Sequence, residues 1–333
     1  MFLIGSYTLA VLFCIITMIC WGSWANTQKL AEQSWRFELF YWDYTIGILL
    51  TALIFALTFG SMGEGGRSFI PDLEQASGEN IMSALIGGVV FNAANILFVA
   101  AISMVGMSVA FPVIIGIALV WGVVVNYLDA PIGNAMVLFI GVAMVAVAIL
   151  LNASAYRKMA GNAIKVPLVW LILCIGSGIL MGYFYNFVAS SMFLDFTVPE
   201  PGKLSPYTAV FFFAVGIFVS NFIFNPILMM KPPVGDPVSF NAYFLGNFKT
   251  HLIGILGGAI WCIGMSFNII ASGTAGPAIS YGLGQGATIV AALWGIYIWK
   301  EFKGAPQGTG TLLNLMLIFY FIGIGLIILA RLI

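Results

Sequence analysis

Ten stretches of about 20 mainly apolar residues follow one another along the chain, and this repeated length constrains the fold more than any other feature. A helix crosses the hydrocarbon core of a bilayer with about 20 such residues, whereas barrel strands are about half as long and alternate in polarity. We therefore predict an all-α polytopic membrane protein with ten transmembrane helices. The predicted spans are Tyr7–Trp24, Phe40–Gly60, Ile81–Ile102, Met107–Leu128, Gly133–Asn152, Pro167–Met192, Pro206–Met230, His251–Ala271, Pro277–Trp299 and Leu312–Leu332.

The composition excludes a soluble fold. Of the 333 residues, 62% are hydrophobic and 7% are charged, whereas soluble domains carry about 25% charged residues. The net charge of +0 gives no basic surface for a nucleic acid. The four cysteines lie inside apolar runs, where we interpret them as small packing residues and not as a disulfide framework or a metal site.

Lysine and arginine residues are distributed unequally between the two sets of loops. The loops after the odd-numbered spans hold nine, namely Lys29, Arg36, Arg157, Lys158, Lys165, Lys231, Lys249, Lys300 and Lys303, and the other side holds three, namely Arg67, Lys203 and Arg331. Basic residues are enriched in cytoplasmic loops. The count therefore predicts both termini outside, and the opposite orientation, with both termini inside, is the alternative. We expect a multi-pass protein of the cell (inner) membrane.

Similar residues recur at offsets between 160 and 173 along the chain. Cys14, Gly22 and Asn26 match Cys174, Gly182 and Asn186, Tyr44-Thr45 matches Tyr207-Thr208, Asn95 matches Asn268, and Trp121-Gly122 matches Trp294-Gly295. We interpret this order as two five-helix repeats, residues 1–160 and 161–333, within one integrated membrane domain. Because five is odd, the repeats insert with opposite topology, which places a cavity near the midplane between them.

Loose sequence motifs along nearly the whole chain resemble a known group of carriers. Cys20-Trp21-Gly22-Ser23-Trp24-Ala25-Asn26 resembles members of the drug/metabolite transporter superfamily, and Trp42-Asp43-Tyr44 with Ala56-Leu57-Thr58-Phe59-Gly60 resembles its ureide permease family. The likeness continues through Gly87-Gly88, Asn95, Val105-Gly106-Met107-Ser108-Val109, Asn126-Tyr127-Leu128-Asp129, Gly257-Gly258, Gln285, Trp294-Gly295 and Lys300-Glu301. The stretch from Tyr281 to Glu301 also resembles the glucose/ribose porters.

The resemblance implies a secondary active, proton-coupled transporter of a ureide such as allantoin or a nucleobase such as uracil. The short central loop Ala153–Lys165 and the cluster Trp21-Gly22-Ser23-Trp24 depart from the plant ureide permeases, which leaves the substrate open. A sugar porter and a broad-specificity exporter are the alternatives within transport. A membrane scaffold, an intramembrane enzyme and a channel are alternatives outside it. The expected partners are a small-molecule substrate, the lipid bilayer and protons.

Asp43 is the only acidic residue inside an apolar run. Ionisable groups in this setting mark transport pathways and proton relays, so Asp43 is the candidate proton-coupling residue. The structural alternative is an interfacial cap one turn inside the span, or a partner of Arg36 or Lys29. His251 opens the eighth predicted span, where we interpret it as an interfacial cap in preference to a proton relay.

Amide side chains inside the spans are candidates for substrate binding. Asn92 and Asn95 share a helix face, Asn268 matches Asn95 in the second repeat, and Tyr281 and Gln285 share a face of the ninth span. An amide both donates and accepts hydrogen bonds, which suits a heterocycle with amide-like edges or a sugar hydroxyl. The alternative role is a hydrogen bond between neighbouring helices.

Several aromatic residues complete the set of candidate substrate contacts. Trp21 and Trp24 lie three residues apart, where they either stack on a planar ring or anchor the helix at the interface. Trp121 and Trp294, related by the repeat, are candidates for the cavity wall, and so is the pair Tyr185-Asn186 in the sixth span.

Motifs for enzymatic chemistry are missing from the sequence. It contains no Walker loop and no His-Glu-x-x-His motif, and its single histidine cannot build a Ser-His-Asp set in mid-span. We therefore predict no enzymatic activity, no metal and no cofactor.

Overall fold

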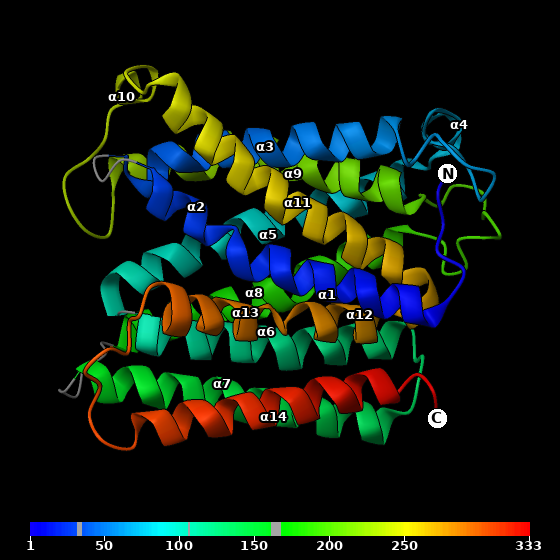
Figure 1. Cartoon of the computed structure of the whole chain (residues 1–333). Helices are drawn as coiled ribbons and strands as arrows, with labels where there is room; N and C mark the ends of the chain where they lie inside the picture. Colours follow the sequence, from blue (N-terminus) through cyan, green and yellow to red (C-terminus); the bar gives the residue numbers. More distant parts are fainter. Residues whose placement is uncertain (32–34, 106, 161–167) are drawn as a thin grey trace.

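The computed structural model describes residues 1–31, 35–105, 107–160 and 168–333. The chain forms a bundle of long helices with both termini at the same end (Figure 1). Within the described ranges, ten helical segments are long and apolar enough to cross a membrane, which confirms the predicted all-α class and number of spans. The helices are α1 (Tyr7–Ser23), α2 (Ala25–Leu30), α3 (Phe37–Leu57), α4 (Phe69–Gln75), α5 (Gly78–Val105), α6 (Met107–Asp129), α7 (Ala135–Ala160), α8 (Leu168–Ser191), α9 (Pro206–Met230), α10 (Asn241–Phe244), α11 (Phe248–Ala275), α12 (Pro277–Gly284), α13 (Ala287–Leu293), η1 (Trp294–Ile298) and α14 (Thr309–Leu329).

The bounds of two spans, α7 and α3, differ from those of the apolar runs that predict them. Helix α7 continues to Ala160, so the first part of the predicted loop Ala153–Lys165 is helical. An α-helix satisfies its own backbone hydrogen bonds and can therefore extend beyond the hydrocarbon into a polar sequence. Helix α3 begins at Phe37, which places Asp43 roughly 9 Å along the helix axis from its first residue. Lys165 and Pro167 lie outside the described residues.

The ninth span is broken in its middle. Helix α12 ends at Gly284, α13 begins at Ala287, and Gln285 and Gly286 form a turn between them. The amide N–H of Gly286 donates to Leu283 O, three residues back, in place of the α-helical partner four residues back. Irregular backbone at this depth in a membrane protein is found where it lines a cavity.

Glycines allow two pairs of helices to cross in close contact. A Cβ atom on Gly47 or Gly258 would overlap the facing backbone at the crossing of α3 and α11, and one on Gly88 or Gly216 would do so where α5 crosses α9. Small residues at such crossings let two backbones approach, which is how helices associate in lipid. These crossings hold α3 to α11 and α5 to α9.

Candidate substrate-binding site

A cavity of about 560 Å³ lies between helices of the two predicted repeats. It extends from Trp21 in the middle of the bundle to Lys29 in α2, whose side chain is 48% exposed, at the end of the bundle opposite to the termini. Small-molecule sites have volumes of about 300–1,000 Å³. The cavity is lined by Trp21, Gly22, Trp24, Ala25, Gln28, Lys29, Ala31, Trp35, Phe37, Phe91, Asn95, Phe98, Val99, Ile102, Phe111, Ile115, Met181, Phe184, Trp261, Gln285, Ala287, Thr288 and Ala291.

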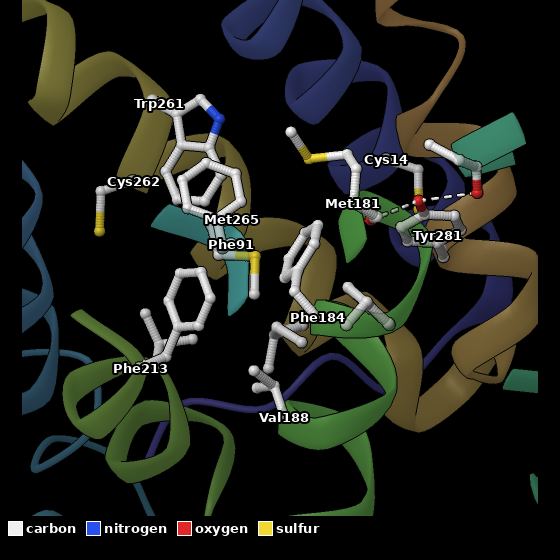
Figure 2. Close-up of a cluster of buried hydrophobic side chains, with 14 of the residues drawn as sticks. Cys14, Phe91, Met181, Phe184, Val188, Phe213, Trp261, Cys262, Met265 and Tyr281 are labelled. Carbon is white, nitrogen blue, oxygen red and sulfur yellow. Dashed lines mark hydrogen bonds between the residues drawn. The ribbon is translucent and has the colours of Figure 1, made fainter. Parts of the chain in front are cut away.

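A cluster of aromatic side chains closes the inner end of the cavity. The ring of Phe91 lies 4.4 Å from that of Trp261 and 5.0 Å from that of Phe184, between centroids. Figure 2 shows these rings gathered from α5, α8 and α11, with Phe213 of α9 beside them. Next to the cluster, the hydroxyl of Tyr281 lies 3.0 Å from Ala118 O and 3.1 Å from Met181 O. These contacts separate the cavity from the end of the bundle that carries the termini.

Two amides bring hydrogen-bonding groups to the cavity wall. The Nδ2 of Asn95 donates to the hydroxyl of Tyr41 at 3.0 Å, and no described residue donates to its Oδ1. Gln285, at the break between α12 and α13, is 7% exposed, and its side chain has no hydrogen-bonding partner among the described residues. Buried amides normally have partners. The hydrogen-bonding groups of Asn95 and Gln285 that have no described partner are therefore available to a solute or to water in the cavity.

Four of the eleven residues that the sequence nominates for substrate binding line this cavity, namely Asn95, Gln285, Trp21 and Trp24. The Trp21 ring stacks on that of Trp261, with centroids 5.8 Å apart, and the Trp21 Nε1 donates to Trp261 O at 3.2 Å. Trp24 lies against Tyr44, 4.7 Å between centroids. Both indoles thus present aromatic surface to the cavity.

Four further candidates lie behind the wall, where they join helices. The Oδ1 of Asn92 accepts from Tyr41, and its Nδ2 donates to Ser220 Oγ at 2.9 Å. Asn268 donates to Ser280 O at 2.8 Å, and the Tyr185 hydroxyl lies 3.0 Å from Ser280 Oγ. Tyr281 reaches the two carbonyls described above. These groups hold α3 to α5, α5 to α9, and α12 to its neighbours.

The remaining three candidates lie elsewhere. Trp121 is 37% exposed on the outer surface and packs against Tyr183. Trp294 donates to Ser23 Oγ at 2.9 Å and lines a side cavity of about 110 Å³. Asn186 donates to Asp129 at 3.1 Å in a separate cavity of about 260 Å³ that also includes Lys203.

Sequence reasoning missed several cavity-lining residues. Phe91 lies one turn from Asn95, and Trp261 lies two turns from Asn268, so the helical period could have nominated both. Trp35 precedes α3 in a segment that carries no comparable signal. It lines the cavity near Lys29 and Phe37.

Asp43 lies beside the chain's only histidine. The Nδ1 of His251 lies 3.0 Å from each carboxylate oxygen of Asp43, and the Tyr243 hydroxyl donates to Asp43 Oδ1 at 2.6 Å. Burial and this hydrogen bond raise the pKa of Tyr243 above its ordinary value, so the phenol remains a neutral donor. Gly254 of α11 faces the Cβ of Asp43 at a distance that leaves no room for a side chain, which lets α11 approach α3 here.

This geometry corrects two structural interpretations. His251 is not the cap of its helix, because α11 begins at Phe248 and the side chain of Asn247 accepts from the N–H of Thr250. Asp43 has neither Arg36 nor Lys29 as its partner. Arg36 pairs with Glu38, and Lys29 pairs with Glu301 at 3.1 Å.

Comparisons with known proteins agree with the resemblance found in the sequence. The family model described as Ureide permease matches residues 40–167 and 161–330. Ureide permease 1 of Arabidopsis thaliana is 26% identical, covering 98% of this chain and 98% of that protein. The Putative ribose uptake protein RbsU of Staphylococcus aureus (strain COL) is 24% identical, covering 82% of this chain and 85% of its own.

A solved crystal structure has the same fold, with a TM-score of 0.63 at 15% identity over 98% of this chain and 99% of the other. Among the plant relatives, Probable ureide permease A3 of Vigna unguiculata is 24% identical over 90% of this chain and 97% of its own. The two matches of the family model together span most of the sequence. The chain therefore belongs to the ureide permease family, whose named members are transporters and not enzymes.

Proposed function

We propose that this permease is a secondary active, proton-coupled transporter of a small neutral heterocycle, either a ureide such as allantoin or a nucleobase such as uracil. Two amides, Asn95 and Gln285, support this cargo. They have hydrogen-bonding groups without a described partner, and the rest of the cavity wall is mainly aromatic and aliphatic. A flat ring stacks on aromatic faces, and its amide edges pair with amide side chains.

A sugar is the second candidate, because one relative is named as a putative ribose uptake protein. A sugar presents several hydroxyl groups, and each buried hydroxyl without a partner costs about 1–3 kcal/mol. Deep in the cavity, Asn95, Gln285 and Thr288 are the polar side chains, and Thr288 already accepts from Tyr320 at 2.6 Å. This small polar set fits a nucleobase such as uracil, whose few amide edges lie on one flat ring, better than a sugar.

Uptake into proteoliposomes tests the choice of cargo. We expect radiolabelled allantoin or uracil to accumulate when the donor side is more acidic, and ribose and glucose to accumulate much less. Unlabelled allantoin in excess should abolish the signal, as expected of a saturable site. Faster accumulation of ribose than of either heterocycle would assign the cavity to sugars.

The charge distribution supports an inward-open state in the cell membrane. The cavity opens at the end of the bundle that holds Lys29, Arg36 and most other basic residues, and basic loops face the cytoplasm. Both termini, at the opposite end, then lie outside (Figure 1). Access of a protease or a cysteine-labelling reagent to the N-terminus in intact cells measures this orientation. Labelling only from the cytoplasmic side would show that the termini lie inside.

The helix crossings support two inverted repeats, residues 1–160 and 161–333. In the proposed correspondence, α3 of the first repeat matches α9 of the second, and α5 matches α11. The crossing of α3 with α11 then repeats as the crossing of α9 with α5, and each has a glycine on both helices. Such a pair of equivalent crossings suits a carrier in which one repeat rocks against the other around a central site.

Asp43 is the proposed proton-coupling residue. It is 1% exposed, and no lysine or arginine among the described residues forms an ion pair with it. The change Asp43→Asn keeps the side-chain shape and removes the titratable carboxylic acid. We expect this variant to bind allantoin but to lose the stimulation of uptake by a pH gradient. Retention of gradient-driven uptake would remove Asp43 from the coupling mechanism.

A further inference from the structure

Trp35 touches both the cavity and the buried Asp43–His251 pair. It lies just before α3, is 9% exposed and lines the cavity. Its ring centroid lies 5.2 Å from that of His251, with the two planes at 86°, and 6.2 Å from that of Tyr243. Gly246 permits this arrangement, because a Cβ there would overlap both the benzo edge of Trp35 and the His251 Nε2.

The indole N–H of Trp35 is buried and has no hydrogen-bonding partner among the described residues. An indole nitrogen can only donate, so the group that satisfies it must be an acceptor. The benzo edge, on the far side of the ring system from this nitrogen, is the part that meets Gly246 beside His251. Trp35 therefore has one donor without a described acceptor, and its opposite edge lies near Gly246 and His251.

Few other charges face the pair. From α10, Tyr243 donates to Asp43; from α3, Glu38 is paired with Arg36; and from α2, Lys29 is paired with Glu301. Lys249 precedes His251 on α11, and no described acidic residue forms an ion pair with it. Among the described residues, His251 is thus the only basic side chain within ion-pair distance of the Asp43 carboxylate.

We infer that Trp35 couples the cavity to the Asp43–His251 pair: a small turn of its ring brings the buried indole N–H to a carbonyl of the bound solute while the ring stays against His251. This inference depends on the proposed function and deepens it. A protonated imidazole is attracted to the face of an indole more strongly than a neutral one, because the negative face of the ring attracts positive charge. Protonation of the pair therefore changes the preferred position of Trp35, and a solute that holds Trp35 acts back on the pair by the same coupling free energy.

The single histidine makes a direct test possible. Protein purified without a polyhistidine tag, labelled with isotopic histidine and placed in nanodiscs gives one imidazole NMR signal, that of His251. We expect saturating allantoin to move this signal in the wild type. In Trp35→Phe, which keeps a ring but lacks the N–H donor, we expect allantoin to bind about threefold to tenfold more weakly and the signal to stay in place at saturation.

Two further variants keep the test decisive. Trp24→Phe is the matched control, because Trp24 lines the same cavity but contacts Tyr44 and not His251, so the allantoin response of the His251 signal should persist. Gly246→Ala separates Trp35 from His251 without changing a cavity-lining side chain, so allantoin should still bind while the response disappears.

The outcomes separate the two proposals. No binding of allantoin or uracil to the wild type would overturn the proposed function, and this inference with it. Binding of allantoin without movement of the His251 signal, or equal movement in the wild type and in Trp35→Phe, would overturn the inference alone.

Discussion

Replacing Gln285 with methionine removes one acceptor and two donors from the cavity wall while the side chain keeps its length. The Gln285 amide has no described protein partner, so its hydrogen bonds are available to the solute. A neutral hydrogen bond contributes about 0.5–1.5 kcal/mol, so two of them contribute about 1–3 kcal/mol. At 1.4 kcal/mol for each factor of ten, the KM for allantoin uptake should rise about 5-fold to 140-fold.

Stability distinguishes this role from a structural one. Because Gln285→Met breaks no hydrogen bond within the described protein, its midpoint of thermal unfolding in detergent should match that of the wild type. Asn92→Leu is the matched comparison, because Asn92 bonds Tyr41 and Ser220. It should lower the midpoint and affect the KM less. The reasoning is refuted if Gln285→Met unfolds at a lower temperature while the KM for allantoin is unchanged.

Two further predictions concern the scaffold. Gly258→Leu places a side chain against the backbone of α3, and such overpacking costs about 1–3 kcal/mol, so the thermal unfolding midpoint should fall. Gly176→Leu, at a position with open space, is its control and should unfold like the wild type. Glu301→Gln breaks the part-exposed ion pair with Lys29 and should lower the free energy of unfolding by at most about 1 kcal/mol in urea titrations. A larger loss of stability would contradict the view that this part-exposed ion pair contributes little to holding the helices together.

The ten spans were predictable because the thickness of the bilayer sets the length of an apolar run, whatever its neighbours. The first residue of a helix was harder to predict than the number of spans. Asn247 caps α11, and Phe248 and Thr250 continue it, so the helix begins before the apolar run does. An apolar run reports where lipid begins, whereas capping and backbone hydrogen bonds decide where the helix begins.

The candidate site was predictable in part. Asn95 and Gln285 line the cavity, but Asn92 and Asn268 carry the same signal and hold helices together. A polar residue in an apolar run must find a partner, and its sequence position does not say whether that partner is a solute or a neighbouring helix. The partner depends on whether the helix face that carries the residue points to the cavity or to another helix, and only the packing of the fold determines this.

The pairing of Asp43 with His251 could not be predicted, because the two residues are 208 positions apart. Trp35 was hidden for a different reason. The chain has 9 tryptophans, 12 tyrosines and 28 phenylalanines, so an aromatic residue near a span end is no signal in itself. The contact with His251 distinguishes Trp35 from the other tryptophans only when the fold is known.

The aromatic plug formed by Phe91, Phe184 and Trp261 also bears on energy conservation. An ion gradient across a membrane is dissipated by any continuous water-filled path. A carrier whose cavity is open on one side could provide part of such a path. Moving an ion through a region of low dielectric constant is opposed by a Born energy of many kcal/mol. Tightly packed rings from three helices exclude the water that would lower that barrier. In the proposed inward-open state, this packing would let the protein remain in an energised membrane with its cavity empty without dissipating the gradient.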